Sequence, residues 1–156
     1  MRYNLLYLKN IETFKNYTVS YGGKTYKYQL SWDKVKSDDS DTTSEEESVL
    51  SVVLNSAPID DDNFKTAYQR LTLISANKYL GKDVNLSATP DIKFEIELKN
   101  GDVDVITFTK YNENYYLHKL NGIGDELISS RTINLLIQNY EKLRKGEEVD
   151  SPNNQQ

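Results

Sequence analysis

The chain has 156 residues, a formal net charge of −5, 12 Tyr, one His and no Cys. This length fits one domain or two small, closely packed ones with a core of their own. The acidic balance, without a run of Lys and Arg, argues against nucleic acid as a partner. The lack of Cys excludes disulfides, thiolate metal sites and cysteine nucleophiles. No apolar run approaches the roughly 18–20 residues that a membrane span requires.

Residues 14–32 predict a β-hairpin, because apolar and aromatic side chains recur at every second position on both sides of a Gly-Gly turn. Residues 36–48 carry no apolar side chain and predict a disordered acidic loop. Asp38, Asp39 and Asp41 in this loop lack the glycine and the ligand spacing of an EF-hand, so calcium is not predicted there.

A strand is predicted at residues 49–54, and residues 64–74 place their apolar side chains on one face of a helix. Asp60, Asp61 and Asp62 precede or open this helix. Helix capping and metal binding compete for these carboxylates, and capping accounts for all of them. Residues 76–90 are rich in short polar residues and predict a connector.

A second hairpin is predicted at residues 91–109, with a type I′ turn at Asn100-Gly101. Its alternation slips after Val105, which indicates a β-bulge or a segment buried on both sides. A strand at 115–120 and an Asn-Gly turn lead into a helix that begins at Ser129 or Ser130 and ends before Gly146.

The two halves of the sequence resemble each other. In both, a hairpin and a strand ending in Leu-Asn-small precede a capped helix that carries Tyr-x-x-Leu. The predicted fold class is therefore α+β, with antiparallel β-meanders each followed by a packing helix, in two similar β-β-β-α halves. The first half is residues 1–80 and the second is residues 81–146. Residues 147–156 predict a disordered tail.

Three segments carry a family resemblance: VLNSAPIDDDNFKTAYQRL, IKFEIELKNGDVDVITFTKYNENYYLHKLNG and LISSRTINLLIQNYEKLRKG. They resemble the strand, turn, acidic cap, helix, long hairpin and terminal helix of the DUF4340 family, a bacterial domain of unknown function. Ser56 stands where that family's turn usually has Gly. The resemblance implies an extracytoplasmic domain behind an N-terminal membrane anchor that this chain lacks, associated with transporter and gliding-motility components. It supplies no catalytic residues.

Five aromatic residues form the candidate binding surface. If they face solvent together, they suit contact with a protein or a glycan. If instead they lie beneath a helix, they belong to the core, and for the row that contains Trp32 this is the stronger interpretation. The five are Tyr26, Tyr28, Trp32, Tyr115 and Tyr116.

No catalytic residue, cofactor or metal ligand is predicted. The single histidine, His118, lies in a predicted strand and fits the surface of a sheet better than a catalytic or metal site. Four carboxylates on the second hairpin could serve a glycosidase-type reaction, but the solvated face of an amphipathic strand explains them more simply. These are Glu95, Glu97, Asp102 and Asp104.

The absence of a catalytic set and the Tyr-rich meander favour a non-catalytic accessory or recognition module, and the family resemblance implies that it is extracytoplasmic and part of a membrane-associated, transporter-linked complex. Its partners would be proteins of that complex or a cell-surface glycan. The alternative is a carboxylate-based hydrolase that acts in a cleft between the halves. An inhibitory or regulatory domain shares the same sequence features, and composition alone is also compatible with a cytoplasmic protein.

Overall fold

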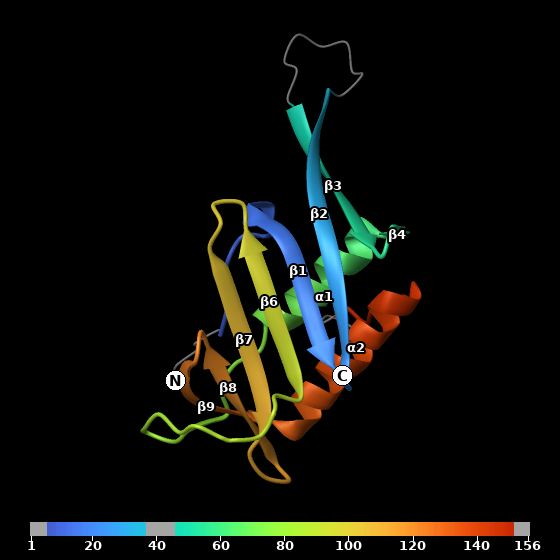
Figure 1. Ribbon diagram of the computed structural model, residues 1–156. Coiled ribbons are helices and arrows are strands. Elements are labelled where there is room, and N and C mark those ends of the chain that lie inside the picture. Colours follow the sequence, from blue (N-terminus) through green and yellow to red (C-terminus); the bar gives the residue numbers. More distant parts are fainter. Residues whose placement is uncertain (1–5, 37–45, 152–156) are drawn as a thin grey trace.

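The computed structural model describes residues 6–36 and 46–151, which form one antiparallel sheet and two α-helices (Figure 1). The strand order is β4-β3-β2-β1-β6-β7-β8-β9-β5. The strands are β1 (Phe14–Tyr21), β2 (Lys24–Lys36), β3 (Glu46–Leu54), β4 (Ala57–Ile59), β5 (Lys78–Tyr79), β6 (Ile92–Leu98), β7 (Val103–Lys110), β8 (Tyr115–Leu120) and β9 (Ile123–Ser129). The helices are η1 (Ile11–Thr13), α1 (Asp61–Thr72) and α2 (Ser130–Lys145).

Both α-helices cover the same face of the sheet, where they also contact each other (Figure 1). The predicted α+β class with antiparallel meanders and packing helices is therefore confirmed. Strands β1 and β6 pair in the middle of the sheet and join the first meander to the second. The similarity of the two halves stays a prediction. Within the described residues, neither helix is long and apolar enough to cross a membrane.

Aromatic side chains fill the space between the sheet and the helices. The ring of Tyr17 on β1 makes edge contacts with Phe64 of α1, at 5.2 Å between ring centres, and with Phe94 of β6, at 5.8 Å. The hydroxyls of Tyr17 and Tyr140 are hydrogen-bonded at 2.7 Å, and Tyr140 donates to the carbonyl of Ala67 at 3.0 Å. Burying Tyr requires such partners, so these bonds allow Tyr17 and Tyr140 to lie in the core among Phe and aliphatic side chains.

Three two-residue hairpin turns place both central residues at positive φ, which defines type I′. Asn100-Gly101 was expected to form another, and that prediction is wrong. Gly101 has φ of 97°, and the carbonyl of Leu98 accepts a hydrogen bond from the Gly101 amide. This is a three-residue loop, in which a type I turn is followed by a left-handed glycine. The type I′ turns are Gly22-Gly23, Asn55-Ser56 and Asn121-Gly122.

Ser56 has φ of 67°, a left-handed conformation that a residue with a Cβ adopts at a cost. We expect Ser56→Gly to raise the free energy of unfolding by about 0.5–1 kcal/mol, since relief of this strain outweighs the added chain entropy of glycine. Urea denaturation would measure the change. The matched control is Ser31→Gly on the exposed face of β2, where glycine weakens the strand. Loss of stability in both variants would contradict the strain argument.

Strand β2 continues past the end of its pairing with β1. The register of β1 shifts between Phe14 and Asn16, and its pairing with β2 stops at Gln29. Beyond that point, as far as the structure describes the chain, β2 pairs only with β3, and the two strands rise from the sheet as a ribbon (Figure 1). Residues 36 and 46–48, predicted as loop, belong to these strands. The rest of the predicted acidic loop, with Asp38, Asp39 and Asp41, lies outside the described residues.

Strand β7 has no bulge, so the bulge considered at Val105 is wrong. Its register with β6 is continuous from Val103 to Phe108. Val103 and Val105 lie on the face away from the helices, which we call the open face. Asp104 takes the inward position in line with Ile106.

Residues 147–151, predicted as part of a disordered tail, instead lie against both helices. Val149 is buried, and its amide donates to Asn63 of α1 at 2.7 Å. The amide of Asp150 donates to Asn139 of α2 at 3.1 Å. The buried valine and these two side-chain acceptors account for the order of a segment that is otherwise polar.

The predicted connector at 76–90 contains the short strand β5, which extends the sheet beside β9. Lys119 on the open face donates to Asp83 at 2.7 Å and to Asn85 at 2.9 Å. These bonds hold the connector against the β8 end of the open face. Among the described residues, neither α-helix lies on the open face at β1 and β6 (Figure 1), where the outward side chains of these strands are partly or fully exposed.

Candidate functional site

The aromatic row of β2 lies on the face that the helices cover. Tyr28 is buried, with its ring centre 5.6 Å from that of Phe64. Tyr26 is half-buried and lies under the guanidinium of Arg144. Trp32 is half-buried on the ribbon, where the Lys99 amino group lies 5.8 Å from its ring centre.

The two tyrosines of β8 point to opposite faces of the sheet, because successive strand residues alternate. Tyr116 is buried on the helix side opposite Ile128. Tyr115 lies on the open face, with the Lys78 amino group 5.1 Å from its ring centre. The five candidate residues therefore do not form one surface, and a binding role for any of them stays a prediction.

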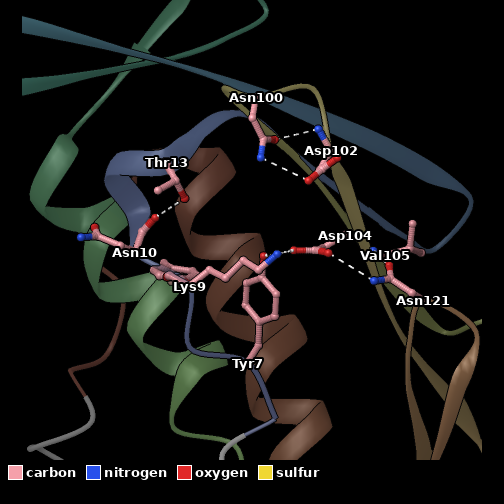
Figure 2. A network of polar contacts seen from close by, with 10 residues as sticks. Tyr7, Lys9, Asn10, Thr13, Asn100, Asp102, Asp104, Val105 and Asn121 are labelled. Carbon is pink, nitrogen blue, oxygen red and sulfur yellow. Dashed lines mark hydrogen bonds and ion pairs between the residues drawn. The ribbon is translucent and has the colours of Figure 1, made fainter.

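The structure brings together a polar cluster that the sequence does not single out. Asp104 lies at the start of β7 on the helix side, where its carboxylate accepts from Tyr7 at 2.8 Å and pairs with Lys9 at 2.6 Å (Figure 2). Asn121 donates to the other carboxylate oxygen at 3.2 Å and also accepts from the Val105 amide. The cluster thus ties the N-terminal segment, β7 and the β8–β9 turn together.

The pKa shifts of Asp104 and Tyr7 indicate which of the two groups carries the proton. Burial alone would raise the pKa of Asp104, but hydrogen bonds from Lys9, Tyr7 and Asn121 together hold it below its ordinary value. Burial and the neighbouring carboxylate raise the pKa of Tyr7 well above its ordinary value. Near neutral pH the carboxylate therefore stays ionised and the phenol stays protonated, which suits positioning of the segment rather than proton transfer.

A surface depression of about 450 Å³ adjoins this cluster and shares Lys9 with it. Leu98 provides apolar surface, and Asn100 on its rim bonds both the amide and the carboxylate of Asp102 (Figure 2). This volume lies within the roughly 300–1,000 Å³ of typical small-ligand sites. The lining residues are Lys9, Asn10, Glu12, Thr13, Leu98, Lys99, Asn100 and Asp102.

The four carboxylates considered for hydrolysis do not converge. Glu95 and Glu97 lie on the open face as predicted, paired with Lys93 and Asn16 respectively. Asp102 is bonded to the side chain of Asn100 within its own turn. Asp104 points to the helix side instead, because its register places it in line with Ile106.

Asp60, Asp61 and Asp62 can place one carboxylate oxygen each within 4.8 Å of one another. The Asp60 carboxylate accepts from the amides of Asp62 at 2.9 Å and Asn63 at 3.3 Å. This is the N-cap of α1, so the predicted capping role of Asp60 is confirmed.

His118 is buried on the helix side of β8, so its predicted place on the surface of the sheet is wrong. Its Nδ1 lies 3.3 Å from Glu126, and its ring centre lies 5.3 Å from that of Phe108. Within the described residues, its Nε2 has no hydrogen-bond partner. Burial lowers the pKa of His118 by more than Glu126 raises it.

This lowered pKa predicts acid-sensitive stability. Because the ordinary pKa near 6.5 applies to the unfolded chain, protons favour unfolding as the pH falls below that value. When the pH falls from about 7.5 to about 5.5, the free energy of unfolding of the native chain is expected to decrease by up to about 1.4 kcal/mol more than that of His118→Gln. Urea unfolding at both pH values checks this. Equal losses in the two proteins would contradict it.

Tyr7 and Lys9 were missed because residues 1–13 show no clear periodicity. Asp104 carried a usable signal, since it falls in the inward alternation of Ile106 and Phe108. In comparisons with family models, curated proteins and solved structures, nothing matches this chain. The resemblance to the DUF4340 family stays a prediction.

Proposed function

We propose that this chain is a non-catalytic recognition module that binds a partner protein in a membrane-associated complex outside the cytoplasm. The depression beside Asp104 carries this proposal. Two carboxylates at or beside it are already bonded, Asp104 to Tyr7 and Asp102 to Asn100, and this favours contact with a partner over acid–base chemistry. The compartment and the link to a transporter follow from the family resemblance alone.

Site-specific photo-cross-linking in cells of the native host tests the proposal. A photo-reactive residue at Glu12, which is exposed and lines the depression, is expected to trap a protein of the membrane fraction. The matched control is Glu113, exposed in the β7–β8 turn at the other end of the sheet, which should trap none.

Two results would contradict the proposal. One is fractionation of the native gene product with the cytosol, together with no adduct from Glu12. The other is hydrolysis of a glycoside or peptide by the purified chain that is lost in Asp102→Asn or Glu97→Gln, because carboxylates would then do chemistry. Adducts from both Glu12 and Glu113 would also count against the depression as the binding site.

A further inference from the structure

The ribbon formed by residues 30–36 of β2 and 46–52 of β3 has an unpaired edge. From Leu30 to Lys36, β2 is paired on one side with β3, and within the described residues no strand pairs on its other side. Strand β1 begins at Phe14, directly after η1, so β2 extends beyond the end of its neighbour. Every second residue of this edge presents its backbone N–H and C=O outward.

The side chains of the ribbon differ between its two faces. Leu30 and Trp32 lie on the helix side, opposite the buried Val52 and Leu50. Ser31 and Asp33 lie on the other side and are exposed. A strand added at this edge would therefore bury apolar side chains beside Leu30 and Trp32 and keep polar ones beside Ser31 and Asp33.

The surface beside the ribbon also fits a ligand. Lys99 lines the depression of about 450 Å³ and also lies over Trp32, so the two features adjoin. The indole N–H of Trp32 is buried and, within the described residues, has no hydrogen-bond partner. An isolated two-stranded ribbon is only marginally stable, and a third strand would stabilise it.

We propose that residues 30–36 of β2 accept an extended segment of a partner protein as an additional strand, with apolar residues at alternate positions and a Lys or Arg opposite Asp33. This rests on the proposed function and names its binding edge. Backbone hydrogen bonds to the added strand provide the affinity, and the Asp33 carboxylate makes the edge selective for a segment with a basic residue opposite it.

A second copy of this chain suits the edge less well. Asp33 is the central residue of 30–36, so symmetric antiparallel pairing of two copies would place Asp33 opposite Asp33. Like charges directly opposite each other destabilise a strand pair. The Asp33 carboxylate thus favours a basic residue opposite it, supplied by a different chain, over a second copy of Asp33.

The probe is the peptide acetyl-Val-Thr-Val-Lys-Val-Thr-Val-amide, titrated into the full chain and followed by backbone amide chemical shifts. We expect shifts centred on residues 30–36 and binding at least about tenfold tighter than for the same peptide with Glu in place of Lys. Asp33→Lys should reverse this preference. Lys27→Glu is the matched control, because Lys27 lies on the same strand where β1 occupies the edge, and it should leave the preference unchanged.

Two forms of the peptide test backbone pairing itself, one methylated at the backbone nitrogens of odd positions and one at those of even positions. Only one form should lose binding, because alternate amides of an added strand face β2. Equal loss or equal retention, shifts outside residues 30–36, or a chain that dimerises through this edge would overturn the proposal. If Glu12 still traps a partner in cells when the peptides fail, the recognition function survives and only this edge is wrong.

Discussion

Asp104→Ala is expected to lower the free energy of unfolding by about 3 kcal/mol, the largest effect anticipated for a single polar residue of this chain. The change leaves the Tyr7 hydroxyl and the Asn121 amide without their acceptor. Lys9 loses its ion pair, but its side chain is 47 % exposed and can be solvated by water. The expected loss of stability is therefore at the lower end of the range for breaking a buried ion pair. Chemical denaturation at neutral pH measures the loss.

Asp102→Ala is the matched control for this prediction. It removes a carboxylate two residues earlier, whose side-chain bond is to Asn100 in an exposed turn, and it should change stability by no more than about 0.5 kcal/mol. Similar losses in the two variants would show that the Asp104 cluster does not hold the N-terminal segment.

The same cluster predicts a pH dependence. Because the pKa of Asp104 is lower in the folded chain than in the unfolded chain, its contribution is present above the ordinary pKa of about 3.9 and is lost as the pH falls below it. Asp104→Ala should therefore flatten the acid limb of the stability curve.

Tyr140→Phe is expected to lower the free energy of unfolding by about 2 kcal/mol, and Tyr17→Phe by less than about 1 kcal/mol, although the two hydroxyls share one hydrogen bond. The asymmetry follows from the direction of the bonds. Tyr140 donates to Ala67, so Tyr17 donates to the oxygen of Tyr140. Removing the Tyr140 hydroxyl leaves a buried Tyr17 donor without an acceptor, whereas removing that of Tyr17 leaves the bond to Ala67 intact.

The double variant provides the decisive comparison. The double variant Tyr17→Phe/Tyr140→Phe should be more stable than Tyr140→Phe alone, since the second change removes the donor that had lost its acceptor. A double variant less stable than Tyr140→Phe, or equal costs for the two single changes, would show that the bonds run in the opposite direction. Thermal unfolding of the native chain, the two single variants and the double variant at one pH gives the double-mutant cycle.

The sheet and helices were predictable because their signals are local. Alternation of buried and exposed residues marked β1, β2 and β6, and the carboxylates before α1 and the glycine after α2 marked where the helices begin and end. The short strands β4 and β5 were missed, since three and two residues carry no detectable period. Their pairing with β3 and β9 depends on tertiary contacts.

The candidate site was largely unpredictable, because its members come from distant segments. Tyr7 and Asp104 are 97 residues apart, and no pattern within the sequence links them. The aromatic residues were visible as candidates, but alternation alone did not decide whether a helix covers their face. The polar position of Asp104 in an inward row was the one local signal, and it was masked by the neighbouring Val103 and Val105.

The pairing of β1 with β6 has a consequence for synthesis of the chain. Tyr21 of β1 pairs with Ile92 of β6, so one edge of β1 has no strand partner until residues 92–98 have been made. During translation the first meander and α1 would emerge with an open strand at their centre, which is a template for wrong pairing. A ribosome that stalls before Leu98 would therefore release a substrate for chaperones and proteases.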